Sequence, residues 1–116
     1  MTMTFSMVTI DCSDASKLAR FWTEALGTEV LQDYGGYVIL RPPAAGGVAV
    51  GLQQVPEPKQ GKNRVHLDML SDDRAAEAER LVALGATVVG EHVEPSFAWT
   101  VLHDPEGNEF CIAQQG

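Results

Sequence analysis

Apolar side chains recur at helical spacing in two stretches of the chain. Residues 14–26 carry them at positions i, i+3, i+4, i+7 and i+8, which gives a helix one buried face: Leu18, Phe21, Trp22, Ala25 and Leu26. Residues 72–84 carry a narrower stripe: Ala75, Ala78, Leu81 and Val82. A Ser-Asp pair that can cap a helix opens each stretch, and a glycine that can end one follows it. The pattern therefore predicts two helices, each packed on one face.

Shorter apolar and alternating stretches predict eight strands. They are expected at residues 7–12, 29–33, 37–41, 48–54, 64–70, 87–91, 97–103 and 109–113. Turn-forming residues separate them, most clearly in the Asp-Pro-Glu-Gly-Asn segment at residues 104–108. Residues 55–63 contain two prolines, which are excluded from helix interiors and from strand ladders, so this segment is predicted to be a linker.

The two halves of the chain follow one plan. Displacing the sequence by half its length superimposes the Ser-Asp pairs at residues 13–14 and 71–72 and the Ala-Leu-Gly triplets at residues 25–27 and 83–85. We therefore predict an α+β fold in which one domain, residues 1–116, contains two βαβββ modules in tandem. Module one is residues 1–54, the linker is residues 55–63, and module two is residues 64–116. Since one helix covers only one face of each curved mixed sheet, the two open faces are expected to form a cleft.

Composition narrows the range of partners. The chain has 116 residues, 45% of them apolar, and a net charge of −8, which suits one small acidic domain. Sequence-independent nucleic-acid binding and binding to anionic membranes both need basic patches, so neither partner is expected. No stretch approaches the roughly 20 apolar residues of a membrane span, and no leader pattern is present, which favours a cytoplasmic protein. Cys12 and Cys111 lie in predicted strands without CxxC spacing and are expected to be buried thiols.

Five segments carry a resemblance to a known family. They are VTIDCSD at residues 8–14, ARFW at 19–22, NRVHLD at 63–68, LGATV at 84–88 and HDPEGNEFC at 103–111. Together they resemble the vicinal oxygen chelate superfamily, which includes glyoxalases, bleomycin resistance proteins and extradiol dioxygenases. The resemblance covers nearly the whole chain. It implies paired βαβββ modules that curl around a cavity, often completed by a homodimer, and we expect a homodimer here.

The resemblance also implies where a metal ion would be bound. Metallated members usually use His, Glu or Gln, His and Glu, and these positions correspond here to Met7, Gln53, His66 and Cys111. A thioether contributes almost nothing to a hard divalent ion, so no metal is favoured. The alternative is a divalent ion such as zinc held by His66, Gln53 and Cys111. Placing Glu109 at the position of Cys111 would require the motif to slip by two residues and is not favoured.

Strand alternation predicts which side chains face the cleft. In the fifth strand, Val65, Leu67 and Met69 are expected to pack against the helix, which turns His66 and Asp68 toward the cleft. The same reasoning turns Met7, Asp11 and Cys111 inward, elimination adds Trp99 and His103, and the resemblance adds Gln53. The candidate ligand-binding residues are therefore Met7, Asp11, Gln53, His66, Trp99, His103 and Cys111.

Two inward carboxylates, Asp11 and Asp68, need compensation if they are buried. They are expected to accept backbone hydrogen bonds, to pair with Arg64 or Arg41, to have a raised pKa, or to meet a cation. A raised carboxyl beside His66 could transfer protons, which makes His66 and Asp68 the candidate catalytic residues.

Three functions are therefore weighed. The favoured one is a glyoxalase-like protein that binds a small molecule in a cleft without a catalytic metal, such as antibiotic sequestration of the bleomycin-resistance type; the charge of −8 suits a cationic ligand. The first alternative is a metal-dependent lyase, isomerase or dioxygenase that acts on a substrate with vicinal oxygens. The second is a metal-independent enzyme that uses His66 and Asp68. Whether the chain is an enzyme stays open at this point.

Overall fold

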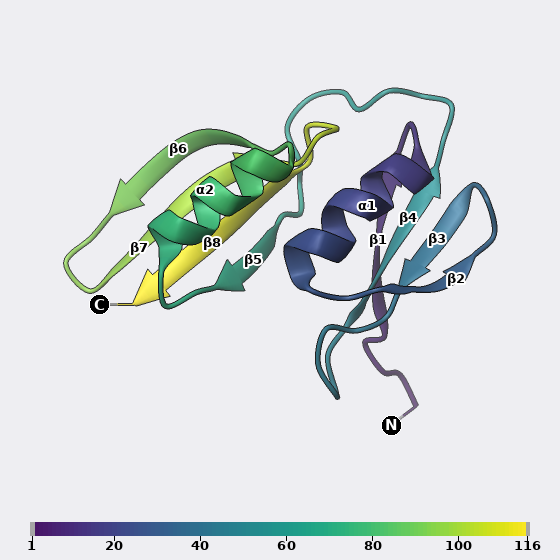
Figure 1. Cartoon of the computed structure of the whole chain (residues 1–116), viewed down its shortest axis with the longest axis horizontal. Helices are drawn as coiled ribbons and strands as arrows, with labels where there is room; N and C mark the ends of the chain where they lie inside the picture. Colours follow the sequence, from purple (N-terminus) through teal and green to yellow (C-terminus); the bar gives the residue numbers. More distant parts are fainter. Residues whose placement is uncertain (1, 116) are drawn as a thin grey trace. The chain divides into compact units, whose positions relative to one another are not determined.

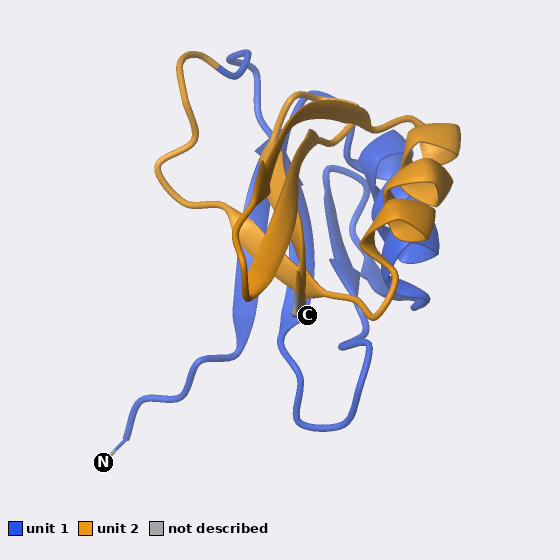
Figure 2. Cartoon of the chain, turned by 90° about the vertical axis from the view of Figure 1, so that its left-hand side faces the viewer, with its two compact units in different colours: residues 1–59 blue, residues 60–116 orange. Residues whose placement is uncertain are grey.

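The computed structural model describes residues 2–115, which form two compact units (Figure 1). The boundary between residues 1–59 and residues 60–116 falls inside the predicted linker (Figure 2). Each unit is a four-stranded mixed sheet with one helix along one face. The prediction of an α+β fold with two βαβββ modules is therefore confirmed. Within the described residues, no helix is long and apolar enough to span a membrane.

Unit 1 contains the first helix and four strands. In chain order they are β1 (Met7–Cys12), α1 (Ala15–Leu26), β2 (Val30–Asp33), β3 (Tyr37–Leu40) and β4 (Ala49–Gln54). The sheet order is β1-β4-β3-β2; β1 and β4 run parallel, and the other neighbours run antiparallel. The core lies between sheet and helix, where Leu18 and Trp22 of α1 are almost completely buried, as are Val38, Leu40 and Leu52 of the sheet.

Unit 2 repeats this topology. Its elements are β5 (Leu67–Leu70), α2 (Arg74–Leu84), β6 (Thr87–Val93), β7 (Phe97–His103) and β8 (Glu109–Gln115). The sheet order is β5-β8-β7-β6, with β5 and β8 parallel. Leu81 of α2 is buried, as are Leu102, Phe110 and Ile112 of the sheet. This smaller core agrees with the narrow apolar stripe of the second helix.

A glutamine at the end of the fourth strand of each sheet binds the start of the helix in its own unit. The Gln54 side-chain oxygen accepts a hydrogen bond from the Ala15 backbone N–H at 3.1 Å. The Gln114 side-chain oxygen accepts one from the Arg74 backbone N–H at 2.8 Å. Each bond satisfies one of the N–H groups that the first turn of a helix leaves unpaired. The repeat therefore extends to a contact that links strand and helix in both units.

The second helix begins later than the sequence predicts. Its N-cap is Asp73, whose carboxylate accepts a hydrogen bond from the Ala76 backbone N–H, and the Ser71 hydroxyl accepts one from the Asp73 N–H. The predicted Asp72 cap was therefore wrong by one residue. The sequence carries two consecutive aspartates here, and either can cap a helix.

The fifth strand is shorter than predicted, because it begins at Leu67. Val65 is 74% exposed, so the expectation that it packs against the helix is wrong. The segment before the strand is held by side chains instead: Lys62 donates a hydrogen bond to the Glu109 carboxylate, and the Asn63 side-chain oxygen accepts one from the Glu109 backbone N–H. Polar contacts thus replace strand pairing at this end of the sheet.

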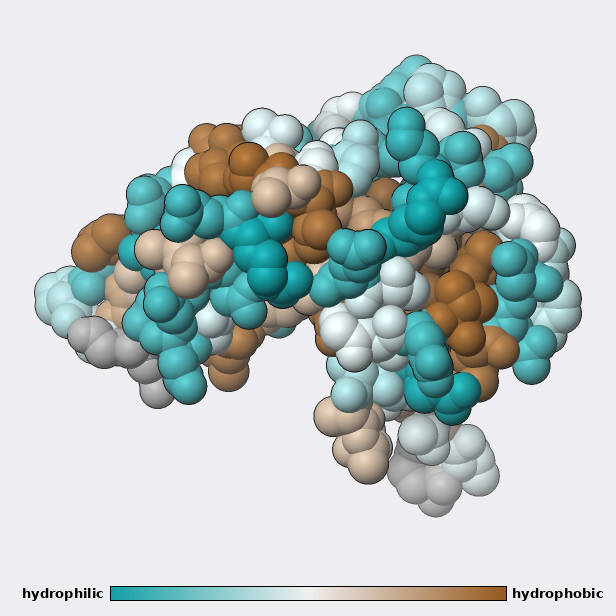
Figure 3. Space-filling view, viewed as in Figure 1, coloured by the Kyte–Doolittle hydropathy of each residue, from teal (hydrophilic) through white to brown (hydrophobic). Residues whose placement is uncertain are grey.

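Exposed apolar side chains are scattered over the surface. On the side seen in Figure 3, hydrophobic residues form separate patches among hydrophilic ones. Val88, Val89 and Val93 of the edge strand β6 are exposed, and a register shift between Val88 and Gly90 interrupts its pairing with β7. Irregular pairing of this kind is common at sheet edges.

Candidate functional site

The face of the second sheet that α2 does not cover carries most of the predicted site residues. Phe110 and Ile112 of β8 are buried in the core, so alternation turns Glu109, Cys111 and Ala113 to the opposite face. We call this side of the sheet the open face of unit 2.

Strand pairing orders the open face of unit 2 into rows. Asp68, Cys111 and Val101 lie in one row across β5, β8 and β7. His103 lies opposite Glu109 in the row toward one end of the sheet. Leu70, Ala113, Trp99 and His92 form the row toward the other end. The face is therefore polar at one end and largely apolar and aromatic at the other.

The polar end brings His66, Asp68 and Cys111 together. Their ligand atoms all lie within 4.8 Å of one another, and His66 Nδ1 lies 3.5 Å from Asp68 Oδ1. Burial is the main cause that raises the pKa of the Cys111 thiol to about 11, and the charge and hydrogen bond of Asp68 contribute to this rise. The thiol is therefore protonated at neutral pH and donates its hydrogen bond to Asp68. The Asp68 side chain itself is 65% exposed.

Glu109 also lies at the polar end. The sequence did not favour it as a site residue, because placing it at the position of Cys111 required the motif to slip by two residues. Its carboxylate is 14% exposed and accepts a hydrogen bond from Lys62 Nζ at 2.9 Å. His66 Nε2 lies 4.0 Å from its other oxygen, so the imidazole sits between the carboxylates of Asp68 and Glu109. The Lys62 hydrogen bond is the main reason that the pKa of Glu109 lies below its usual value, and the charges of His66 and His103 add to it. Alternation places Glu109 on the same face as Cys111, but nothing in the sequence indicates that linker residue Lys62 reaches it.

The open face of unit 2 also carries three stacked rings. The His92 and Trp99 rings lie 4.7 Å apart between centroids at an interplanar angle of 17°. The Phe97 and Trp99 rings lie 5.3 Å apart at 11°. Alternation along β7 predicts that Phe97 and Trp99 share a face. His92 was missed because the sixth strand was predicted to end at residue 91, whereas it continues to Val93.

The uncovered face of the first sheet has different chemistry. The Tyr37 hydroxyl donates a hydrogen bond to Met7 Sδ at 3.7 Å. Both side chains lie over Gly51, where an added Cβ would be 3.3 Å from Met7 Sδ and from Tyr37 Cε1. Asp11 and Gln53 are direct partners across β1 and β4, and both are exposed. Tyr37 was not among the predicted site residues. The sequence held a signal for it, because Val38 and Leu40 of the same strand are buried and alternation turns Tyr37 to the opposite face.

The carboxylates do not pair with arginine as the sequence suggested. Arg41 pairs with Glu29 at 3.0 Å, and the charged neighbour of Asp68 is His66. Among residues 2–115, Asp11 makes no ion pair. Because water reaches both carboxylates, neither needs a buried counter-charge.

Positions at or just before the first strand of each unit can be compared by counting back from the helix caps. His66 lies seven residues before the N-cap Asp73, and Met7 lies seven residues before the N-cap Asp14. The two positions therefore correspond. A thioether in unit 1 stands where an imidazole stands in unit 2.

The fourth strands can be compared through the helix-binding glutamines. Cys111 lies three residues before Gln114, and Gly51 lies three residues before Gln54. Unit 1 therefore has no side chain at the position that Cys111 occupies in unit 2. Met7 and Gly51 of unit 1 thus correspond to His66 and Cys111 of unit 2. Of these two pairs, only the one in unit 2 offers side-chain atoms that bind metal ions well.

The donor set at the polar end decides which metal it fits. Imidazole, carboxylate and thiolate suit zinc, which binds nitrogen, sulfur and oxygen in tetrahedral sites. Mg²⁺ and Mn²⁺ prefer oxygen ligands at octahedral sites, and the Cys111 thiol does not meet that need. A zinc ion on His66, Asp68 and Cys111 would act as a Lewis acid on a bound oxygen. It would first have to displace the proton that Cys111 holds with a pKa of about 11.

The fold and these positions define a class of protein. Residues 7–113 match the glyoxalase-like domain family, and the chain belongs to that family. The similarity to the vicinal oxygen chelate superfamily seen in the sequence is thereby confirmed. No curated protein matches the chain.

Solved structures share the fold at low sequence identity. A glyoxalase/bleomycin resistance protein/dioxygenase family enzyme from Burkholderia phytofirmans PsJN has a TM-score of 0.81 at 19% identity, covering 97% of this chain and 98% of that one. A mutant of the fosfomycin resistance protein FosX from Listeria monocytogenes, complexed with Mn(II) and a dihydroxypropylphosphonic acid, has a TM-score of 0.78 at 15% identity, with 97% and 89% covered. TioX from Micromonospora sp. ML1 has a TM-score of 0.67 at 16% identity, with 98% and 100% covered.

Proposed function

We propose that this glyoxalase-like protein binds a small organic molecule on the open face of unit 2 and does so without a catalytic metal. The observation that carries the proposal is the arrangement of this face, where a polar group of side chains and a stack of rings lie on one surface of one sheet. Apolar walls with a few polar groups are typical of small-molecule sites. His66, Asp68, Trp99, His103 and Cys111 are the binding residues in this proposal.

The state of the polar end favours binding without a metal. Asp68 accepts the hydrogen bond of the Cys111 thiol, so an ion bound there would have to displace both the proton and this contact. Glu109 is already engaged by Lys62. Cys111 and Glu109 thus have partners inside the protein, whereas the exposed sides of His66 and Asp68 are open to an organic ligand.

Sequestration of a cationic compound, as in bleomycin resistance, is the role we favour for such a protein. The exposed carboxylate of Asp68 and the net charge of −8 support a positively charged ligand. Met7 and Gln53 stay predicted ligand contacts of unit 1. The homodimer and the cytoplasmic location also stay predictions.

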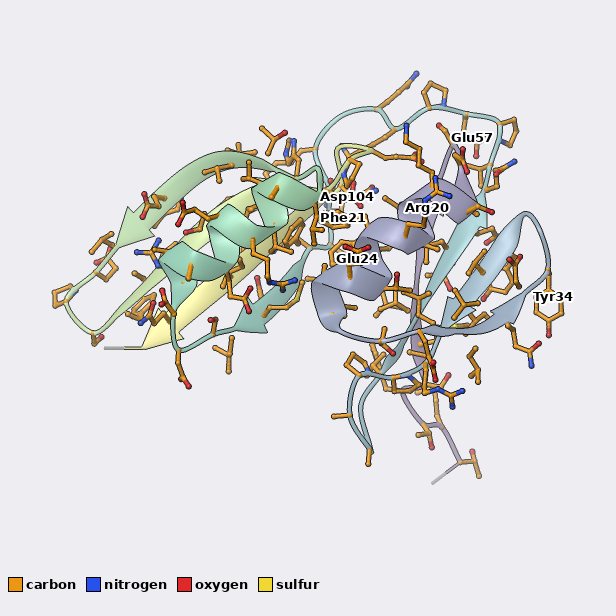
Figure 4. All side chains as sticks on the ribbon, viewed as in Figure 1. Arg20, Phe21, Glu24, Tyr34, Glu57 and Asp104 are labelled. Atoms are coloured by element: carbon orange, nitrogen blue, oxygen red, sulfur yellow. The ribbon has the colours of Figure 1, made fainter. Side chains whose placement is uncertain are left out.

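Thermal shift measurements test the binding proposal. A ligand at 100 times its Kd adds about 2.7 kcal/mol to the free energy of unfolding, which gives a readily measured rise in Tm. We expect hits from a library of small organic compounds on the wild type, and we expect Trp99→Leu to lose their stabilisation. Tyr34→Leu is the matched control, because Tyr34 lies at the exposed turn between β2 and β3 (Figure 4). Equal stabilisation of wild type and Trp99→Leu by every hit would overturn the site, and the absence of hits would overturn the function.

The second candidate is a metal-dependent lyase, isomerase or dioxygenase acting on vicinal oxygens. The mixed donor set of His66, Asp68 and Cys111 is the observation that favours it, and FosX shows that a structural neighbour can be complexed with Mn(II). Metal analysis of protein purified without a polyhistidine tag separates the two candidates. A near-stoichiometric ion that is lost in Cys111→Ser would replace our proposal with this one, and a substoichiometric content would support metal-free binding.

A further inference from the structure

We infer that the ligand of the open face of unit 2 is a flat aromatic ring system that carries a positively charged group on a flexible chain. This inference rests on the proposed function and names the class of its ligand. Two features of the face support it: the ring stack at one end and an exposed carboxylate at the other.

The ring stack provides a planar surface. The His92 and Phe97 rings each lie within 17° of parallel to the Trp99 ring, so the stack presents flat aromatic faces. Phe97 is 44% exposed and His92 is exposed, which leaves those faces accessible. Parallel aromatic rings attract further flat rings through offset stacking. Trp22, by contrast, is buried in the core of unit 1 and offers no such surface.

The surface between the rings and the charge is apolar. Ala113 lies opposite Trp99, and Leu70 lies beyond it on the edge strand β5. Leu70 is strongly exposed although it is a large apolar residue. A hydrocarbon chain that runs from a ring bound at the stack toward β5 would therefore cross Ala113 and Leu70 without desolvating a charge.

Asp68 is the group that would bind the charged end. Leu70 lies in the same row as Trp99, two strands away across the sheet, and Asp68 is two residues from Leu70 along β5. The backbones of Asp68 and Trp99 are therefore roughly 12 Å apart. Glu109, the other carboxylate of this face, is neutralised by Lys62. Asp68 has only the imidazole of His66 as a charged neighbour, and Arg or Lys contacts to it are absent among residues 2–115.

An anionic ligand fits the same face poorly. The one lysine at the polar end, Lys62, already binds Glu109, which leaves His66 and His103 as the basic groups. The exposed Asp68 carboxylate at this end and a chain charge of −8 would repel an anion. The sign of the ligand charge is therefore the sharpest consequence to test.

A pair of dansyl probes tests both the ring and the charge. Dansylcadaverine joins a naphthalene ring by a flexible chain to an ammonium group, and dansyl-6-aminohexanoate carries a similar chain that ends in a carboxylate. Dansyl fluorescence reports binding of either probe, and it does so in variants without Trp99 as well. We expect the ammonium probe to bind the wild type at least about tenfold more tightly than the carboxylate probe at low salt.

Variants assign the two ends of the ligand. Asp68→Asn is expected to weaken the ammonium probe by roughly fivefold or more and to leave the carboxylate probe unchanged or slightly tighter. Trp99→Leu is expected to weaken the binding of both probes. Phe97→Ser, at a more exposed position of the stack, is expected to do the same. Tyr34→Leu removes an exposed aromatic ring and Glu79→Gln an exposed carboxylate outside this face, so both should bind like the wild type.

The outcomes distinguish this inference from the proposed function. Equal affinity of the wild type for the two probes, or equal weakening of both by Asp68→Asn, overturns the ligand class. If neither probe binds but another compound stabilises the wild type and not Trp99→Leu, the ligand class is wrong and the proposed function stands. If no compound binds at all, both are wrong.

Discussion

Replacing Asp68 by Asn should make the thiol of Cys111 easier to ionise. In the wild type its pKa is raised to about 11, first by burial and then by the charge and hydrogen bond of Asp68. At pH 8 a thiol with that pKa is ionised to about one part in a thousand. Since only the thiolate is alkylated, Cys111 is expected to react slowly even with a small reagent.

The size of the change follows from the geometry. The Cys111 sulfur and an Asp68 oxygen lie within 4.8 Å, and Asp68 is 65% exposed, so water screens the interaction. At that distance two unit charges in a water-like medium interact by about 1 kcal/mol. Removing one of them should lower the pKa of Cys111 by roughly 0.7 and raise its alkylation rate about fivefold below pH 9. Burial is unchanged in the variant, so most of the shift should persist.

Alkylation by iodoacetamide at pH 7–10, followed by mass spectrometry, measures the rate at Cys111 separately from that at Cys12. Glu79→Gln is the matched control, because it removes an exposed carboxylate on α2. An Asp68→Asn profile that superimposes on the wild type, or a wild-type profile with the pKa of a free thiol, would refute the reasoning.

Three further changes probe contacts that shape the two sheets. Lys62→Met should lower the free energy of unfolding at pH 7 by at most about 1 kcal/mol, since Lys62 is 72% exposed. Because Lys62 lowers the pKa of Glu109, this stabilisation is present above the usual carboxyl pKa and is lost as the pH falls through the lowered pKa of Glu109. The difference in free energy of unfolding between wild type and Lys62→Met, measured by urea denaturation, should therefore be smaller at pH 3 than at pH 7. Gly51→Ala should cost about 1–3 kcal/mol, because the new Cβ would lie 3.2–3.3 Å from three side-chain atoms; an unchanged urea midpoint would contradict this. Asp104→Ala should lower the free energy of unfolding by about 2 kcal/mol. Buried Asp104 (Figure 4) accepts hydrogen bonds from backbone N–H groups of the β7–β8 turn and from the Asn108 side chain. A loss below about 0.5 kcal/mol in urea denaturation would contradict this expectation.

The fold was predictable because its signals are local and occur twice. Helical spacing, an aspartate cap and a closing glycine mark both helices, and the observed ends differ from the predicted ones by no more than two residues. The error at Val65 has a different cause. Apolar alternation continues through residues 64–66, but the chain there is held by Lys62 and Asn63, which bond to Glu109 from far away in the sequence. Alternation describes a strand only where a neighbouring strand is present to pair with it.

The sequence predicted the face on which a candidate site residue lies only where the pattern of its own strand was enough. Alternation placed Asp68 and Cys111 on the predicted cleft face, and Trp99 was added by elimination. Strand pairing puts these three residues on one face of the second sheet. The neighbours of these residues come from other elements. His92 reaches Trp99 because β6 is longer than its sequence suggests, and Lys62 reaches Glu109 from a segment far away in the sequence. Such contacts depend on register and on side-chain reach, neither of which a single sequence records.

Two nearly identical scaffolds within one chain carry different chemistry at equivalent positions. Unit 1 has Met7 and Gly51 where unit 2 has His66 and Cys111, and the Met7 thioether is already occupied by a tyrosine hydroxyl. Neither a thioether nor a glycine can hold a proton or a hard ion at neutral pH. Since both units keep the same topology and the same glutamine-to-helix contact, this difference does not arise from the requirements of the fold. The polar part of a ligand is therefore expected at unit 2, and replacing His66 or Asp68 should affect binding far more than replacing Met7.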